Sequence, residues 1–216
     1  MRFCVFAREK FYFSMFRDTQ IIQDFFNSQA RRHGDSVKSL AWESEFTQRI
    51  RFFVLADIAP LNKMRILDVG CGKADMHTFF DKEGVPVEYY GVDCSPEMVK
   101  LARKIHPGIR IFYRDFLNDA YYPEIDYAFA SGIANVLTPN NSEYMETLIK
   151  KMFALAKKGA AVNMLSSYAP GSKKNTGMYF YSPEYMLAFA LKLTPKVGLR
   201  HDYLLNDFTL YLYKEE

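Results

Sequence analysis

The chain has 216 residues, of which 49% are hydrophobic and 16% aromatic, and its formal net charge is only +3. This length predicts a single domain of ordinary α/β size with ample material for a core. The balance of 28 basic and 25 acidic residues lacks the basic excess of a nucleic-acid-binding surface, so we expect no nucleic-acid partner.

Hydrophobic spacing and helix-capping residues predict helices and strands that alternate along the chain. The first half is expected to form helices at 18–33 and 44–58, a strand at 65–69, a helix at 75–82, a strand at 87–92, a helix at 95–106 and strands at 110–114 and 125–130. The second half is expected to form a long helix capped by Asn140, Asn141 or Ser142 and closed by Gly159, a strand at 160–165, a helix starting at Ser182-Pro183, and β-like runs at 196–204 and 207–213. Such alternation is typical of a doubly wound α/β sheet.

No apolar run approaches the roughly 20 residues that a membrane span needs. The apolar start of the chain is interrupted by Arg8, Glu9 and Lys10, which argues against a signal peptide. The three cysteines, Cys4, Cys71 and Cys94, show no metal-ligand spacing and are odd in number. We therefore expect no metal site, no disulfide framework and no membrane partner, and a reducing cytoplasm fits best.

Three aspartates stand where short apolar runs stop. They are Asp68 after Ile66-Leu67, Asp93 after Gly91-Val92, and Asp115 in Tyr113-Arg114-Asp115. Ligands of open α/β sheets bind at the carboxyl ends of the strands, where these residues would lie. Gly70 and Gly72 follow the first aspartate, and without a Cβ they allow a sharp turn and a close approach of backbone to ligand.

This pattern, Asp68-x-Gly70-x-Gly72 opening a helix with Asp93 ending the next strand, resembles motif I and its successor in class I S-adenosylmethionine-dependent methyltransferases. The resemblance covers about residues 63–216. It implies a Rossmann-like, mostly parallel seven-stranded sheet with an antiparallel last strand, and S-adenosylmethionine as the cofactor. The third small position of the family loop is Ala74 here; because alanine disfavours positive φ, we expect it inside the first helical turn.

The resemblance also implies roles for particular residues. Asp68 would hold the ammonium group of the cofactor, Asp93 both ribose hydroxyls, and Asp115 with Phe116 the adenine. The whole expected cofactor-binding set is Asp68, Gly70, Cys71, Gly72, Asp93, Cys94, Met98, Asp115, Phe116 and Ser131. In this set Met98 and Cys94 would cover the other adenine face, and Ser131 would lie near the sulfonium or serve only as a strand cap.

Residues 1–62 lie outside the common fold of the family, and we expect them to form a helical cap over the site of residues 63–216, in one compact unit. Trp42, the only tryptophan, either lies on this lid or is a buried packing anchor. Arg51 could reach the carboxylate of the cofactor, although a solvated arginine is the commoner outcome. Tyr168, Tyr179 and Tyr181 could shape the acceptor pocket.

The segment after the strand at 125–130 lacks the Asn/Asp-Pro-Pro-aromatic run of adenine and cytosine amino methyltransferases, and no Pro-Cys dipeptide is present for attack on cytosine C5. The leading expectation is therefore methyl transfer to an oxygen or nitrogen atom, or a carbon atom, of a small molecule. The alternatives are an RNA or protein methyltransferase, an NAD(P)-dependent oxidoreductase, and a non-catalytic S-adenosylmethionine-binding module. Histidines are the first candidates for a general base, but a lone histidine is usually structural. The sequence leaves the oligomeric state open.

Overall fold

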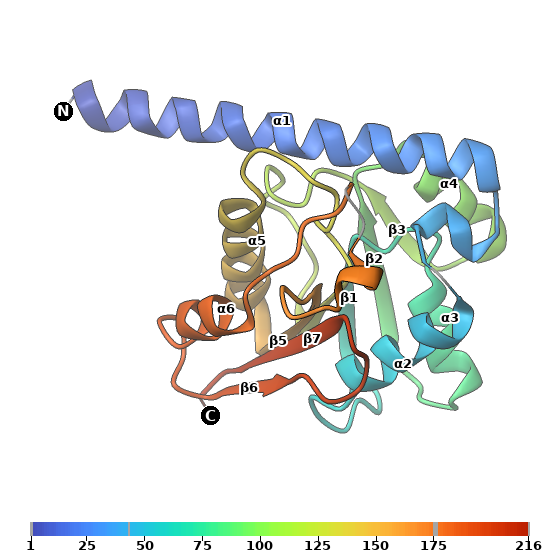
Figure 1. Ribbon diagram of the computed structural model, residues 1–216. Coiled ribbons are helices and arrows are strands. Elements are labelled where there is room, and N and C mark those ends of the chain that lie inside the picture. The colour runs from blue at the N-terminus through green and yellow to red at the C-terminus, as the bar shows by residue number, and fades with distance from the viewer. Residues whose placement is uncertain (1, 43, 175–176, 216) are drawn as a thin grey trace.

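The computed structural model describes residues 2–42, 44–174 and 177–215, with the side chains of all of these except 2–14 and 173. Its helices are α1 (Arg2–His33), η1 (Val37–Leu40), α2 (Glu45–Ala56), α3 (Asp75–Lys82), α4 (Pro96–Ile105), α5 (Asn141–Leu155), η2 (Gly171–Lys173) and α6 (Pro183–Ala190). Its strands are β1 (Arg65–Val69), β2 (Glu88–Asp93), β3 (Arg110–Tyr113), β4 (Ile125–Ser131), β5 (Ala156–Leu165), β6 (Val197–Arg200) and β7 (Asp207–Tyr213). Figure 1 shows how they are arranged.

The strands form one seven-stranded sheet in the order β3-β2-β1-β4-β5-β7-β6. Strands β1 to β5 are parallel to one another, whereas β7 runs antiparallel to both β5 and β6. The predicted doubly wound sheet with an antiparallel last strand is confirmed. The strand order reverses between β1 and β4, and the crevice at such a switch point is where open α/β sheets bind their ligands.

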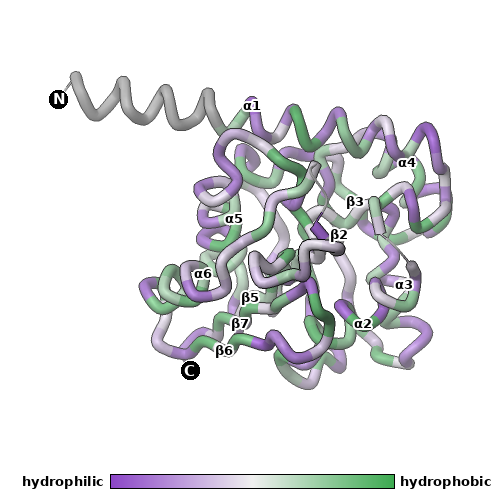
Figure 2. Tube along the Cα trace, in the orientation of Figure 1, coloured by the Kyte–Doolittle hydropathy of each residue, from purple (hydrophilic) through white to green (hydrophobic). Residues whose placement is uncertain are grey.

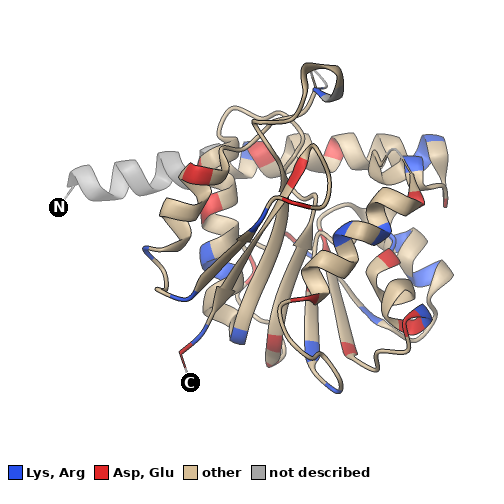
Figure 3. Ribbon diagram, turned by 60° about the horizontal axis from the view of Figure 1, so that its bottom comes forward, with Lys and Arg blue, Asp and Glu red and all other residues tan. Residues whose placement is uncertain are grey.

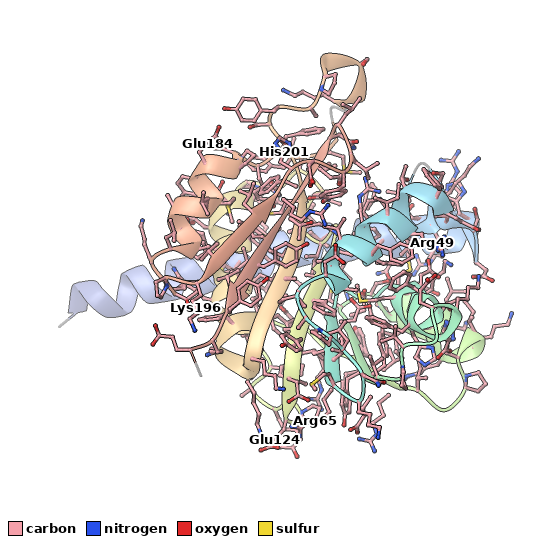
Figure 4. The ribbon with its side chains drawn as sticks, turned by 90° about the horizontal axis from the view of Figure 1, so that it is seen from below. Arg49, Arg65, Glu124, Glu184, Lys196 and His201 are labelled. Atoms are coloured by element: carbon pink, nitrogen blue, oxygen red, sulfur yellow. The ribbon has the colours of Figure 1, made fainter. Side chains whose placement is uncertain are left out.

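Both faces of the sheet are covered by helices. Helices α2, α3 and α4 pack on one face and α5 and α6 on the other. Each face of the sheet has its own hydrophobic core, and alternating strand residues contribute to one or the other. In β1, Ile66 belongs to the core with α2 and α3, while Leu67 and Val69 belong to the core with α5. Charged residues lie mainly at the strand ends and on the helices (Figure 3). Arg65 and Glu124, for example, form an ion pair where β1 and β4 begin (Figure 4).

Helix α1 lies across one end of the sheet (Figure 1). It begins at Arg2, well before the predicted residue 18, because residues 2–17 contain neither glycine nor proline to interrupt a helix. Its described part alternates between hydrophobic and hydrophilic residues (Figure 2), as a helix with one buried face does. Arg31 pairs with Glu97 of α4, and Thr19 hydrogen-bonds Tyr144 of α5, so α1 bridges the two helical layers.

Some predicted boundaries were wrong. Helix α5 ends at Leu155 and the chain enters β5 at once, because Ala156 already pairs with Ile125; Gly159 therefore lies within the strand. Asn140 occupies the N-cap of α5 without a side-chain capping bond. Strand β6 stops at Arg200, where its pairing with β7 ends, so the rest of 196–204 is not strand.

Among the described residues no helix is both long and apolar enough to cross a membrane. The division of the chain at residue 62 stays a prediction, and α2 of the N-terminal segment contributes Phe52, Val54 and Leu55 to the core on its face of the sheet.

Candidate active site

The loop between β1 and α3 winds through three residues with positive φ. These are Gly70 (φ 72), Gly72 (φ 54) and Ala74 (φ 65). The expectation that Ala74 lies inside the first helical turn was wrong: it is the N-cap of α3, and its backbone N–H donates to the carbonyl of Cys71 at 2.8 Å. An alanine held in this region costs about 1–3 kcal/mol, which the surrounding packing must offset.

Neighbouring segments fix the position of this loop. The backbone N–H groups of Gly70 and Cys71 donate to the carbonyl of Val92 at 2.8 and 3.1 Å, which ties the loop to the end of β2. A Cβ at Gly72 would lie 2.4 Å from Cδ2 of Leu40. Glycine at this position is therefore what allows η1 to pack directly on the loop.

Two carboxyl groups stand at the ends of β1 and β2, that of Asp68 buried and that of Asp93 partly buried. Asp68 is 3% exposed and accepts a hydrogen bond of 2.6 Å from the Tyr89 hydroxyl; burial raises its pKa to about 7. Asp93 accepts from the backbone N–H groups of Gly72 and Ser95, both at 2.8 Å, which orients its carboxylate. Burial also raises the pKa of Asp93, against the opposite effect of these two donors.

At the end of β3, Asp115 accepts hydrogen bonds from the Leu117 backbone at 3.0 Å and the Asn118 amide at 2.6 Å. At the end of β4, Asn163 of β5 accepts from the Gly132 N–H at 2.9 Å and donates to the Ser131 hydroxyl at 3.4 Å. The side chain of Asn163 is fully buried, so it fixes the segment that follows β4. Sequence reasoning did not identify Asn163, whose position in β5 gives no signal of its contact with β4.

A first cavity of about 860 Å³, open in part to solvent, lies at these strand ends. All ten residues of the expected cofactor-binding set line it. Its other lining residues are Ile22, Phe26, Leu40, Trp42, Gln48, Phe52, Asp75, Val92, Arg114, Gly132, Ile133, Tyr144 and Leu148. Most of these residues belong to the N-terminal segment or to α5 and are not part of a sequence motif. Only the hydrophobic spacing of these helices could have indicated that they face the cavity.

A second cavity, of about 690 Å³, adjoins the first. The two share Phe26, Leu40, Trp42 and Gly132 in their walls. A Cβ at Gly132 would lie 2.3 Å from Cη2 of Trp42, so the indole ring lies directly against the segment after β4. Of the two interpretations of Trp42, the structure favours the position on the lid, because the ring is part of the wall between the cavities and is only half-buried.

Arg51 is buried, contrary to the expectation of a solvated side chain. It is 4% exposed and donates from Nε and Nη2 to the two carboxylate oxygens of Asp207, at 2.8 and 2.6 Å. Its Cζ also lies 4.3 Å from the centre of the Trp42 ring. Arg51 lines the second cavity, not the first, so the structure does not place it with the expected cofactor-binding residues. Its partner Asp207 is 156 residues away, beyond the reach of any local pattern.

The three tyrosines expected around the acceptor pocket are not among the residues that line these two cavities. Tyr181 donates to the Ala134 carbonyl at 2.6 Å, Tyr179 hydrogen-bonds Ser142, and Tyr168 is exposed and bonds Glu184. Their neighbours Met178 and Phe180 line the second cavity in their place. Side chains alternate in direction along this extended segment, so Tyr179 and Tyr181 face away from the cavity that Met178 and Phe180 line.

The lining of both cavities, within the described part of the chain, contains no histidine. His201 lies near Glu184 of α6 (Figure 4) and against the ring of Phe208. His77 and His106 pack against each other with ring centres 5.2 Å apart. A histidine base for the reaction therefore has no support from the positions of these side chains.

Comparisons with known proteins bear on this site. The sequence model of a family described as "Methyltransferase domain" matches residues 61–169. A curated protein of Mycobacterium tuberculosis named "Putative methyltransferase Rv1506c" is 33% identical over 155 residues, which cover 69% of this chain and 92% of that protein. The chain belongs to the methyltransferase domain family. It is a class I methyltransferase that depends on S-adenosylmethionine.

Solved structures agree on the fold. Magnesium protoporphyrin IX methyltransferase of Synechocystis PCC 6803, with bound S-adenosylmethionine, has a TM-score of 0.65 at 17% identity and covers 92% of this chain and 97% of its own. The 1,6-didemethyltoxoflavin-N1-methyltransferase of Burkholderia thailandensis has a TM-score of 0.62 at 16% identity, and the match covers 91% of this chain and 88% of that protein's chain. At these identities the likeness establishes the fold alone.

Proposed function

We propose that this methyltransferase transfers the methyl group of S-adenosylmethionine to an oxygen or nitrogen atom of a small molecule that binds in the second cavity. The observation that carries the proposal is that this cavity adjoins the first at Trp42 and Gly132. About 690 Å³ of space, part of it open to solvent, lies between its lining residues.

In this proposal the first cavity holds the cofactor. Asp68 pairs with the ammonium group, Asp93 accepts from the ribose hydroxyls, and Asp115 lies with Phe116 at the adenine. Met98 and Cys94 cover the other adenine face, Gly70, Cys71 and Gly72 lie along the amino-acid part, and Ser131 lies toward the sulfonium. What supports these roles is that all ten residues line one cavity and that backbone donors already orient the Asp93 carboxylate.

Methyl transfer is an in-line displacement at the sulfonium carbon, and the protein's main contribution is to align donor and acceptor away from water. Phe26 of α1 and Trp42 belong to the walls of both cavities, so the N-terminal segment would close over both reactants at once. Because the described lining of both cavities holds no histidine, a neutral nitrogen or an acceptor that ionises readily suits the site best.

The other candidate acceptors fit less well. An RNA acceptor would require a basic surface, and the chain carries both charges in nearly equal number. A protein acceptor would require an open groove, whereas α1, η1 and Trp42 border the second cavity. The oxidoreductase alternative and the non-catalytic module are set aside because the chain belongs to the methyltransferase family.

Calorimetric titration with S-adenosylhomocysteine, with NADH in parallel, tests the cofactor roles. We expect binding of S-adenosylhomocysteine alone. Asp93→Ala should weaken it at least about tenfold, because two hydrogen bonds to a carboxylate are lost and each is worth about 1.5–3 kcal/mol. Asp202→Ala is the matched control, since Asp202 is exposed and pairs only with Arg200 among the contacts described.

Equal affinity of wild type and Asp93→Ala would contradict the assigned role of Asp93, and tight binding of NADH would contradict the cofactor assignment. Production of S-adenosylhomocysteine in the presence of small molecules, RNA oligonucleotides or peptides then tests the acceptor class. Turnover with RNA or peptides alone would refute the small-molecule proposal.

A further inference from the structure

Two residues that line the second cavity each carry a buried polar atom without a hydrogen-bond partner among the described residues. These atoms are Nη1 of Arg51 and Oδ1 of Asn135, on side chains that are 4% and 7% exposed. An unpaired buried donor or acceptor costs about 1–3 kcal/mol, and native proteins leave very few of them. Because both residues line one cavity, they are candidates for hydrogen bonds to a bound ligand.

The guanidinium group of Arg51 is held rigidly before any ligand binds. Asp207 occupies Nε and Nη2, and the ring of Trp42 stacks on its face. Both N–H bonds on Nη1 and one on Nη2 are the donors that remain. Because Asp207 already pairs the charge of Arg51, the remaining donors suit a neutral oxygen such as a carbonyl or hydroxyl group.

Asn135 is fixed in a similar way. Its backbone carbonyl accepts from the Tyr179 N–H at 2.7 Å, and the preceding residue, Ala134, has a φ of 58°. The Ala134 carbonyl accepts from the Tyr181 hydroxyl at 2.6 Å and from the Asn141 amide at 2.9 Å. The backbone is therefore anchored on both sides, and the unpaired Oδ1 requires an N–H or O–H donor.

The rest of the wall is mostly apolar. It includes the aromatic residues Phe26, Trp42 and Phe180 and the aliphatic side chains of Leu40, Val136, Leu165 and Met178. Aromatic walls favour flat rings, which stack or pack edge to face against them. An aliphatic amine or a charged headgroup would find little in this cavity to replace its hydration.

We propose that the second cavity binds a planar aromatic or heteroaromatic acceptor that offers an oxygen to Arg51 Nη1 and an N–H or O–H group to Asn135 Oδ1. This inference rests on the proposed function in one respect, namely that the second cavity is where the methyl acceptor binds. It adds the chemical class of the acceptor and two residues that select it.

Four small probes separate the features of such a ligand. 2-Oxindole carries the flat ring, the carbonyl oxygen and the N–H group; indole lacks the oxygen, N-methyl-2-oxindole lacks the N–H group, and δ-valerolactam lacks the aromatic ring. Their dissociation constants are measured by ligand-detected NMR on the full chain, with and without saturating S-adenosylhomocysteine. We expect 2-oxindole to bind most tightly and each of the other probes about tenfold or more weakly, since each loses a hydrogen bond or the stacked ring.

Asn135→Ala should weaken 2-oxindole about tenfold and remove its advantage over N-methyl-2-oxindole, while leaving the affinity for S-adenosylhomocysteine unchanged, because Asn135 does not line the first cavity. Asn206→Ala is the matched control. Asn206 is of the same type and lines the same cavity, but it has no buried unpaired atom among those described. We expect this variant to keep the preference for 2-oxindole.

The proposal is overturned if N-methyl-2-oxindole, indole or δ-valerolactam binds as tightly as 2-oxindole, if none of the probes binds, or if Asn206→Ala and Asn135→Ala lose equal affinity. The titrations without cofactor keep the two claims separate. Failure to bind S-adenosylhomocysteine would refute the proposed function, whereas cofactor binding with no discrimination among the probes would refute only this inference.

Discussion

Asp68→Asn removes a buried charge from the first cavity and keeps the shape of the side chain. The amide oxygen can still accept the hydrogen bond from Tyr89, whose hydroxyl lies 2.6 Å from the Asp68 carboxylate. Burial raises the pKa of Asp68 from 3.8 to about 7, against the opposing effect of the Tyr89 hydrogen bond. The folded protein therefore holds this proton more tightly than the unfolded chain does.

The sign of the stability change follows from that difference. Between about pH 4 and pH 7 the folded state binds more protons at this site, so Asp68 lowers the stability of the cofactor-free protein progressively as the pH rises. The difference between the pKa of Asp68 in the unfolded chain, 3.8, and in the folded protein, about 7, corresponds to about 4 kcal/mol of free energy of unfolding. The free energy of unfolding of Asp68→Asn should therefore exceed that of wild type by up to about this amount above pH 7, and by little at pH 4.

Thermal unfolding of the cofactor-free protein measures the effect. Each kcal/mol shifts Tm by about 2–4 °C in a chain of this size, so the variant should melt several degrees higher at about pH 8 and near the wild-type Tm at about pH 4. In calorimetric titrations, wild type should bind S-adenosylhomocysteine more tightly as the pH rises through about 7, whereas the variant should bind weakly with a flat profile. A variant that is less stable than wild type at pH 8, or a difference that does not change with pH, would refute this reasoning.

Two further substitutions test the architecture around Trp42. Gly132→Ala adds a Cβ 2.3 Å from the Trp42 ring at a φ of 68°, and it should shift the emission of the only tryptophan; Gly84→Ala, with a φ of 66° and open space around it, should lower stability without that shift. Similar emission from both variants would mean that Trp42 does not contact this segment. Arg51→Met should lower the free energy of unfolding in urea by about 3–5 kcal/mol, because the buried Asp207 loses its Arg51 partner. Arg200→Met breaks only exposed ion pairs and should lower the free energy of unfolding by less than about 1 kcal/mol. Equal losses of stability in the two variants would contradict the role assigned to the buried pair of Arg51 and Asp207.

The convergence of the expected cofactor-binding residues on one cavity was predictable because it depends on short-range patterns. Asp68, Gly70 and Gly72 follow one strand directly, and Asp93 and Asp115 end the next two. In a parallel sheet the carboxyl ends of all strands lie at the same edge. Residues at these ends therefore come close together even when they are far apart in sequence. The first cavity shows that convergence, while the contacts of these residues with a bound cofactor stay a prediction.

The second cavity could not be predicted in the same way. It depends on the path of residues 34–42 over the glycine loop, on the packing of Trp42 against Gly132, and on the pairing of Arg51 with Asp207. These contacts join segments up to 156 residues apart and leave no local periodicity to detect. Tyr179 and Tyr181 illustrate the limit: a shift of one residue in an extended segment exchanges the side chains that face the cavity.

The sequence by itself determined the class of sheet and the position of the first cavity, since hydrophobic periodicity and glycines fix local structure and local structure fixes the strand ends. The tertiary structure decided the conformation of Ala74, the burial of Arg51 and the residues that line the second cavity. Their conformations follow from packing between distant segments, where the free energy of a whole interface outweighs the preference of any one residue.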